Sequence, residues 1–310
     1  MSVRLLPSPA EPSGQSILDR CTFPPPATAL TCGVSGGADS LALLALATEV
    51  GCEVTAVHVD HGLRPGSGAE AAVVARAADR FGAAFESVTI DLVDGPNLEA
   101  RARTARLRAL GPDAATGHTA DDQAETVLAN LLRGAGVDGM AGMRAGTRHP
   151  ILALRRSETV ALCAQLGLQP VVDPSNDDPR FLRNRIRGEL LPLCSALAGR
   201  DLVPLLARQA ELLAGDAEVL AALSHLVDPT DARALADAPE PVGRRAVRAW
   251  LRGDAEHPPS LAAVERVLDV ARGRARATEL PGGARVSRSG GRLNMSSGAV
   301  PVQSPRVRSR

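Results

Sequence analysis

The sequence predicts an α/β protein in which a doubly wound parallel sheet is followed by a small helical domain and a short β-hairpin. Three observations predict this order. Short apolar runs alternate with helical patterns between residues 29 and 132, which is typical of a parallel sheet with helices on both faces. From about residue 200, helical patterns follow one another without strands. Near the end, paired glycines separate short apolar stretches.

The first half alternates regularly between strand and helix patterns. The apolar runs that we expect to form strands are residues 29–34, 53–59, 84–90 and 113–117. The Ala-, Leu- or Arg-rich stretches that we expect to form helices are residues 40–50, 68–81, 98–110 and 119–132. Each of the first three helices therefore connects two parallel strands, as in other doubly wound sheets.

The pattern of the second half predicts a separate unit. Helical patterns cover residues 202–226, 241–251 and 261–272, and the glycine pairs predict a hairpin within 277–295. We therefore predict four segments. They are an N-terminal extension (1–28, loose, with a short helix near Ile17), an α/β domain (29–195), a helical domain with its hairpin (196–300) and a disordered basic tail (301–310).

The composition excludes several chemistries. The chain has 310 residues with 35 basic and 35 acidic ones, and every basic residue is Arg. Without Lys there is no Walker-type phosphate loop, Schiff-base aldolase or pyridoxal-phosphate lysine. Without Tyr, and with 2% aromatic residues, a dense aromatic platform for bases is excluded as well. Any phosphate must therefore be held by Arg, backbone N–H groups or hydroxyls.

Charge is distributed unevenly along the chain. Residues 1–195 hold 18 Arg against 22 acidic residues, whereas residues 241–310 hold 14 Arg against 5. A basic C-terminal part on a neutral chain indicates a polyanionic partner. A solvated surface with an Arg-rich codon bias is the alternative explanation.

The cysteines and the hydropathy pattern favour the cytoplasm. Five scattered Cys without a CxxC pair fit reduced thiols and form neither a zinc knuckle nor a redox pair by spacing. The longest apolar run, residues 41–47, is far too short to span a bilayer. We therefore expect no membrane partner. The oligomeric state stays open, with a homodimer among the options.

A glycine-rich loop at residues 33–40, GVSGGADS, follows the first predicted strand and begins the first helix. Small residues let the backbone wrap a phosphate, and the helix N-terminus presents N–H groups with a favourable dipole. The predicted ATP-binding residues here are Ser35, Gly36, Gly37, Ala38, Asp39 and Ser40. Asp39 is also the candidate Mg²⁺ ligand. The alternative is an ordinary glycine turn with a Ser or Asp helix cap.

The SGGADS segment resembles the PP-motif of the N-type ATP pyrophosphatases, which split ATP between its α- and β-phosphates. Further motifs follow in order: VHVDHGLR (57–64), NLEA (97–100) with Arg103 and Arg106, TGHTADDQAET (116–126), DPSN (173–176) and FLRNRIR (181–187). In combination, from about residue 29 to 195, they resemble the short form of the tRNA(Ile)-lysidine synthetase family. One departure is Leu107, where relatives commonly carry an aromatic residue.

The resemblance implies the reaction. An ATP- and Mg²⁺-dependent enzyme would join free L-lysine to carbon 2 of the wobble cytidine in tRNA(Ile) with a CAU anticodon. The cytidine oxygen would first be adenylated, releasing pyrophosphate, and the lysine amine would then displace AMP. Because that amine is mostly protonated at pH 7, with a reference pKa near ~10.4, a carboxylate or His must take its proton.

Residue roles follow from this resemblance and from position at the strand ends. The predicted catalytic residues are Asp39, His118 and Asp122, and Asp60 and His61 are added to the ATP site. The predicted lysine-binding residues are Asp121, Asp122 and Glu125. The predicted tRNA-binding residues, within a tRNA-contacting surface that includes the helical domain, are Arg103, Arg106, Arg183, Asn184, Arg185 and Arg187.

Plainer explanations exist for several of these residues. Asp121 and Asp122 in a first helical turn are also ordinary helix-dipole partners, and the arginines could form a solvated face. His58, between apolar neighbours in a strand, is more simply structural. Two other functions stay open as well: a tRNA cytidine 2-thiolase of the same superfamily, which the scattered Cys disfavour, and a non-catalytic ATP-binding regulator.

Overall fold

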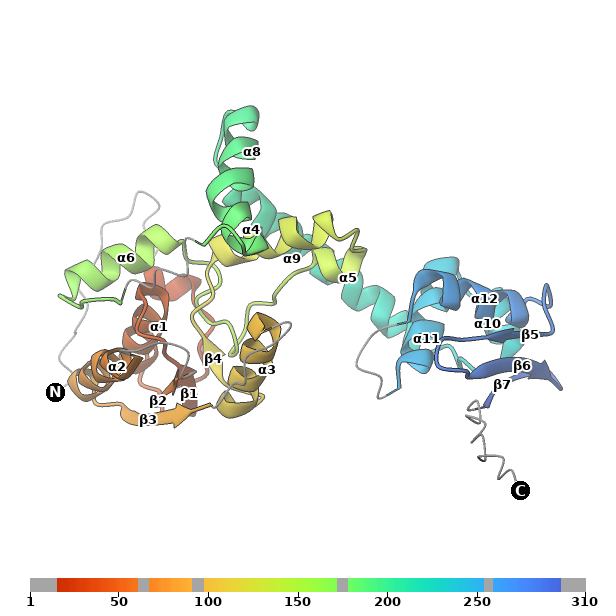
Figure 1. Ribbon diagram of the computed structural model, residues 1–310, viewed down its shortest axis with the longest axis horizontal. Coiled ribbons are helices and arrows are strands. Elements are labelled where there is room, and N and C mark those ends of the chain that lie inside the picture. Colours follow the sequence, from red (N-terminus) through yellow and green to blue (C-terminus); the bar gives the residue numbers. More distant parts are fainter. Residues whose placement is uncertain (1–15, 61–66, 91–97, 172–177, 254–258, 297–310) are drawn as a thin grey trace, which may run out of the picture. The chain divides into compact units, whose positions relative to one another are not determined.

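The computed structural model of the chain describes residues 16–60, 67–90, 98–171, 178–253 and 259–296 (Figure 1). For residues 67–69, 98–100, 102 and 103 it describes the backbone alone. His61, the DPSN motif and the predicted basic tail lie outside the described residues.

Four parallel strands form the sheet in the order β3-β2-β1-β4. They are β1 (Ala29–Gly33), β2 (Glu53–Asp60), β3 (Ala84–Thr89) and β4 (Ala115–Thr116). The chain moves outward from β1 to β3 and then crosses to the other side of β1. The strand order therefore reverses between β1 and β4, the position at which open α/β sheets bind ligands beyond their carboxyl ends.

Helices cover both faces of this sheet, which confirms the doubly wound α/β prediction. One face carries α1 (Ala38–Glu49), α2 (Ser67–Phe81) and α6 (Arg156–Gln165), and the other carries α3 (Leu98–Leu110). Strand β2 shows the alternation of side chains directly. Val54 and Ala56 belong to the core under α1, whereas Val57 contacts Leu110 and its neighbours on the opposite face.

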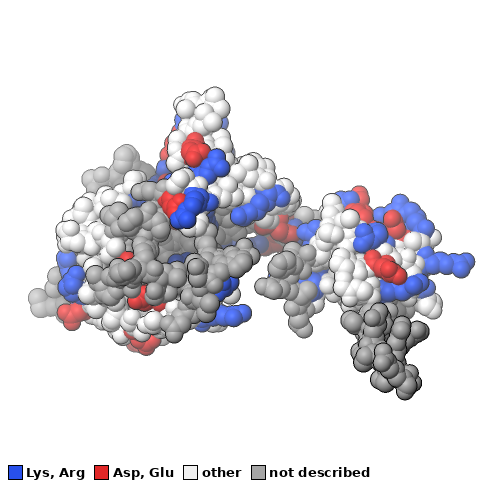
Figure 2. Space-filling view, viewed as in Figure 1, with Lys and Arg blue, Asp and Glu red and all other residues white. Residues whose placement is uncertain are grey.

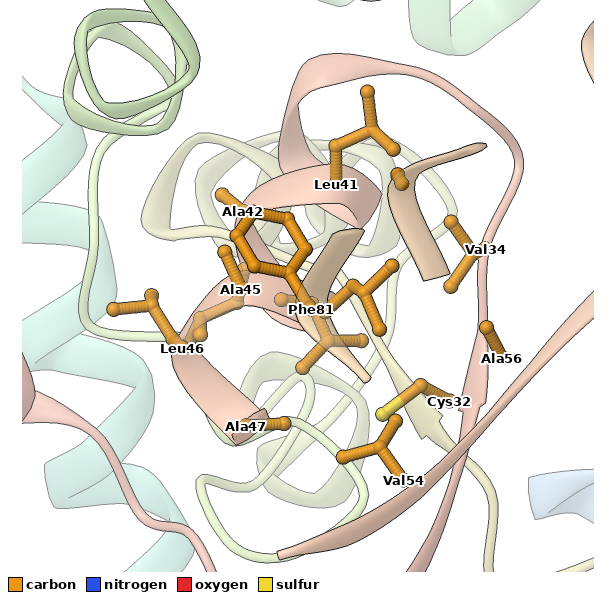
Figure 3. Close-up of a cluster of buried hydrophobic side chains, with 14 of the residues drawn as sticks. Cys32, Val34, Leu41, Ala42, Ala45, Leu46, Ala47, Val54, Ala56 and Phe81 are labelled. Carbon is orange, nitrogen blue, oxygen red and sulfur yellow. The ribbon is translucent and has the colours of Figure 1, made fainter. Parts of the chain in front are cut away.

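The α1 helix is central because it is apolar all round. Every residue from Ser40 to Ala47 is buried. Figure 3 shows Leu41, Ala42 and Ala45 gathered with Phe81 of α2 and Cys32 of β1. A helix without a polar face must be covered on all sides. The start of α1 is therefore held rigidly by the core below it.

Beyond the sheet, α4 (Ala120–Leu132) is packed against chain segments far along the sequence. These are α7 (Leu182–Arg185), a π-helical turn η3 (Ile186–Leu190) and α8 (Leu191–Ala198). Ala124 and Leu128 share one buried cluster with Ile186, Leu191 and Val203. A short helix, α5 (Val137–Met140), follows α4.

The chain divides into two compact units, Met1–Ala214 and Gly215–Arg310. The division falls within α9 (Val203–His225), later than the predicted boundary at residues 195 and 196. The physical reason is that Val203, Leu206 and Ala207 are packed with α4 and η3, so the start of α9 belongs to the first unit.

No single helix among the described residues has the length and apolarity to cross a membrane, α9 included. The pair Leu182–Ala198 and Val203–His225, bent by 96°, passes that test together by length and composition alone.

The second unit combines helices with an antiparallel sheet. Its helices are α10 (Ala232–Asp237), α11 (Glu240–Arg252) and α12 (Leu261–Ala271), and its strands are β5 (Ala277–Glu279), β6 (Arg285–Ser289) and β7 (Arg292–Ser296). The predicted hairpin is confirmed in β6 and β7, and β5 adds a third strand, since both glycine pairs are turns. Gly290 and Gly291 have φ of 56° and 77°, the two positive values that a type I′ hairpin turn requires.

The end of the N-terminal extension is attached to the first unit. Ser16 caps a short 3₁₀ helix, η1 (Ile17–Arg20), and Leu18 and Phe23 are packed against the core. The guanidinium of Arg20 is ion-paired with Glu158 of α6. The prediction of a loose segment was therefore wrong for residues 16–28, whereas the predicted helix near Ile17 is confirmed.

Candidate active site

The glycine-rich loop connects β1 to α1 through residues 34–37. The Ser35 N–H donates to Ser40 Oγ at 3.2 Å, and that hydroxyl donates to the Gly37 carbonyl at 2.9 Å. Gly36 has a φ of +88°. Gly37 is the N-cap of α1 and makes no side-chain capping hydrogen bond. The loop therefore places the first N–H groups of α1, which have no partner inside the helix, at the switch point of the sheet.

Two neighbouring strands hold the loop in place. The Val34 N–H donates to the Val57 carbonyl at 2.9 Å, and His58 Nδ1 lies 3.0 Å from the Val34 carbonyl. On the other side, a Cβ on Gly117 would lie 2.7 Å from the Asp39 carbonyl oxygen and 2.9 Å from the Ser40 nitrogen. The segment after β4 therefore lies against the first turn of α1 at a spacing that only glycine permits.

Three carboxylates from α1 and α4 converge on the guanidinium of Arg156. Arg156 Nε lies 3.1 Å from Asp39 Oδ2, Nη2 lies 3.0 Å from Asp122 Oδ1, and Nη1 lies 3.5 Å from Glu125 Oε1. Glu125 is 1% exposed and also accepts two hydrogen bonds from Arg187, at 2.6 and 3.0 Å. We call Asp39, Asp122 and Glu125 the carboxylate cluster. It carries one more negative charge than the two arginines neutralise.

The two aspartates of the cluster differ in their electrostatic environment. Burial raises the pKa of Asp39 above its usual value, against the hydrogen bond from Thr159 and the charge of Arg156. Burial acts in the same direction on Asp122, but the charge of Arg156 and the N–H of Thr119 outweigh it, so the pKa of Asp122 is lowered. Asp122 is therefore a stable carboxylate, whereas Asp39 lies in a site that penalises its charge.

Asp121 faces away from this cluster. Its carboxylate accepts hydrogen bonds from the Arg155 side chain at 3.1 and 3.3 Å and from the Arg156 backbone N–H at 2.8 Å. It thereby caps the start of α6 from outside that helix. The structure thus brings together two of the three predicted lysine-binding residues and separates Asp121 from them.

The structure adds Arg156 and Thr159 of α6 to the site, whereas Arg155 beside them bonds Asp121 and Asp201 outside the carboxylate cluster; sequence reasoning missed all three. Thr159 Oγ1 donates to Asp39 Oδ1, and Arg155 also bonds Asp201. One signal was present in the sequence: two adjacent arginines begin a helix, where the helix dipole disfavours positive charge. Such a placement indicates that carboxylates of other segments hold them.

His118 lies after β4 in a small polar cluster with Thr116 and His149. Thr116 Oγ1 is 2.7 Å from His118 Nδ1 and 2.9 Å from His149 Nδ1, and it donates to the Arg148 carbonyl at 3.2 Å. The two Nδ1 atoms also lie 3.3 Å from each other, so the donor and acceptor roles in this cluster depend on the tautomer of each imidazole. His149 was missed because nothing in the local sequence relates it to His118.

The predicted tRNA-binding arginines fall into distinct environments. Burial and the charge of Arg183 both lower the pKa of Arg106, so these two cations lie close together. Arg183 also donates to Thr126 Oγ1 at 3.1 Å. Arg187 is held by Glu125, and the exposed Arg185 forms a surface pair with Glu189.

The remaining predicted residues lie at the margins of the site. Asp60 ends β2, the neighbour of β1. Asn184 Nδ2 donates to the Asp178 carbonyl at 2.9 Å. The backbone places Arg103 in α3, one turn before Arg106.

Comparison with known proteins gives a consistent result. Residues 12–194 match the PP-loop domain family. The chain is 45% identical over 235 residues to a tRNA(Ile)-lysidine synthase of Rhodococcus erythropolis, covering 70% of this chain and 72% of that one. It is 42% identical over 270 residues to the same enzyme of Nocardia farcinica, covering 81% and 85%.

Among solved structures, a U34-tRNA thiolase from Methanococcus maripaludis matches with a TM-score of 0.47 and 18% identity, over 61% of this chain and 73% of that one. The extent and identity of the sequence matches place this chain in the tRNA(Ile)-lysidine synthase family of PP-loop proteins.

Proposed function

We propose that this protein uses ATP to join free L-lysine to carbon 2 of the wobble cytidine of tRNA(Ile) with a CAU anticodon, giving lysidine, AMP and pyrophosphate. The observation that carries this proposal is that the phosphate loop and the carboxylate cluster lie together at the switch point of the sheet. The phosphate loop at the start of α1 and the carboxylate cluster share Asp39. A phosphate site and a cation site are thus adjacent, as adenylation followed by amine attack requires.

The loop supplies the groups that bind the phosphates of ATP. The N–H groups at the start of α1 and the hydroxyls of Ser35 and Ser40 lie together on this loop. They orient the α-phosphate toward the cytidine oxygen. That oxygen forms a bond to phosphorus while the bond to the bridging oxygen breaks, and pyrophosphate leaves with the electron pair.

The residues present fit a Mg²⁺ ion held mainly by phosphate oxygens. In the part of the chain that the structure describes, no group of three His, Cys, Asp or Glu side chains is placed to hold a metal ion alone. Magnesium in such sites keeps phosphates and waters as ligands and needs only one or two carboxylates. Asp39 would hold it, and the ion would neutralise phosphate charge.

The carboxylate cluster and His118 serve the lysine step. The carboxylates of Asp122 and Glu125 attract the lysine ε-ammonium, and their ion pairs with Arg156 and Arg187 fix them in place. His118, whose ring is held by the Thr116 hydroxyl, takes a proton from that ammonium. The neutral amine then attacks carbon 2, and AMP leaves.

The arginines bind the RNA. Arg103, Arg106, Arg183 and Arg185, with Asn184, lie on α3 and α7 of the first unit. Figure 2 shows arginine side chains over the visible face of the second unit. Its exposed arginines include Arg248, Arg252, Arg266, Arg276, Arg285, Arg288 and Arg292. Phosphates are their natural partners.

The cytoplasm is the compartment for this reaction, since ATP, tRNA and free lysine meet there. The five cysteines are all free thiols, the state that a reducing compartment maintains.

One assay tests the whole proposal. The protein is incubated with ATP, Mg²⁺, radiolabelled lysine and a CAU-anticodon tRNA(Ile) transcript, with a methionine tRNA of the same anticodon as control. We expect label in the tRNA(Ile) alone, and only when every component is present. ATP binding without any label in RNA would favour a non-catalytic regulator instead.

A further inference from the structure

Arg156 is the described arginine whose ion pairs reach the phosphate loop. It is the first residue of α6, and its Nε lies 3.1 Å from Asp39, the second residue of α1. Its side chain is 28% exposed, so it is not sealed in the core. The helix dipole at the start of α6 opposes a cation there. The carboxylate cluster therefore holds the guanidinium beside the loop.

The docking of α6 does not require this side chain. Arg155 ties the start of the helix to Asp121 and Asp201, and the Arg156 backbone N–H bonds Asp121. Glu158, in the same turn, is paired with Arg20 of the N-terminal segment. These bonds attach α6 from two sides, so the Arg156 guanidinium is available for another role.

The adenylation step needs such a cation. When the cytidine oxygen attacks the α-phosphorus, negative charge accumulates on the departing pyrophosphate. The chain has no lysine, so a side-chain cation that stabilises this charge must be an arginine. A guanidinium also presents two parallel N–H donors that match a phosphate.

We propose that Arg156 is a catalytic residue of the adenylation step: it contacts the β- and γ-phosphates of ATP and stabilises the leaving pyrophosphate. The inference rests on the function proposed above. Phosphate oxygens bound at the loop compete with the carboxylates of Asp39 and Asp122 for the N–H groups of Arg156. The guanidinium can therefore pair with them before lysine enters the site.

The first test measures pyrophosphate binding by calorimetry in the absence of RNA and lysine. Arg156→Met should raise the Kd for inorganic pyrophosphate about tenfold or more, as the loss of a charge-assisted hydrogen bond does. Arg155→Met is the matched control, because it removes ion pairs from the same helix start without facing the loop. It should bind pyrophosphate as the wild type does. Equal binding by Arg156→Met and the wild type would overturn the proposal.

The second test separates the two chemical steps. With α-labelled ATP and no lysine, single-turnover adenylation of the tRNA by Arg156→Met should be slower by about 100-fold or more. Arg156→Lys should restore part of the rate, since it keeps the charge without the two parallel donors. Transfer of lysine to tRNA that the wild type has already adenylated should be slowed far less than adenylation in Arg156→Met, because no pyrophosphate leaves in that step.

Thermal denaturation distinguishes this role from a structural one. If both arginine variants lose thermal stability, adenylation and lysine transfer in parallel, Arg156 is structural and the proposal is wrong. If the wild type itself does not adenylate the RNA, the proposed function fails, whereas pyrophosphate binding still decides the role of Arg156.

Discussion

Adding one methyl group at Gly117 tests whether the contact between the β4–α4 segment and the start of α1 sets the geometry of the site. The new Cβ would lie 2.7 Å from the Asp39 carbonyl oxygen, 2.8 Å from its carbon and 2.9 Å from the Ser40 nitrogen. An ordinary contact begins at 3.4 Å. These backbone atoms cannot rotate away as a side chain would, so the two segments must separate by about 0.7 Å, the difference between 3.4 and 2.7 Å.

The displacement predicts two separate effects of Gly117→Ala. Overpacking of this size should lower the free energy of unfolding by about 1–3 kcal/mol. Because Asp39 and His118 lie on the two segments, the rate of lysidine formation should fall by about 10- to 100-fold, as for other misplacements approaching 1 Å. Thermal denaturation measures the first effect, and lysine incorporation at saturating ATP measures the second.

Gly136→Ala is the matched control. Gly136 is likewise a glycine just before a helix, at the N-cap of α5, and a Cβ there would meet nothing within 4 Å. It should keep the wild-type rate. If Gly117→Ala retained both the melting temperature and the rate of the wild type, the tight contact would be irrelevant and the reasoning refuted.

Three further predictions follow from the site and the helices. Because the pKa of Asp39 is raised in the folded protein, its charge destabilises the fold above that pKa, so Asp39→Asn should melt no lower than the wild type at pH 7 while losing adenylation. The pKa of Asp122 is lowered, so its charge stabilises the fold at pH 7 and Asp122→Asn should melt at a lower temperature than the wild type. In an acid titration of stability, this difference should shrink as the pH falls below about 4. Thr116→Val removes the hydroxyl that contacts both imidazoles, so the pH–rate profile of lysine transfer should shift while ATP binding stays unchanged. An unshifted profile contradicts the role of His118 as the base. Gly215→Ala, at an exposed position inside α9 with nothing within 4 Å, should raise the free energy of unfolding by about 0.5–1 kcal/mol in denaturant titration, and no change would contradict the helix-propensity argument.

The sequence alone determined the order of elements and the edge of the sheet at which the candidate site lies. Alternating apolar runs and helical patterns predicted the four strands and the helices between them, because both depend on local periodicity. Strand β4 was the exception, with two residues instead of the five predicted. Motifs placed directly after strands had to meet, since the carboxyl ends of parallel strands share one edge. Asp39 and Asp122 were found in this way.

Only the tertiary structure decided which groups neutralise those carboxylates. Arg156 pairs with Asp39 across 117 positions of sequence, and Arg187 pairs with Glu125 across 62. No local pattern encodes such pairs, because they depend on where α6 and η3 are packed. The same packing placed the start of α9 in the first unit, and His149 beside His118. Local patterns specify elements and strand ends, whereas charge partners between distant segments follow from the packing of the whole chain.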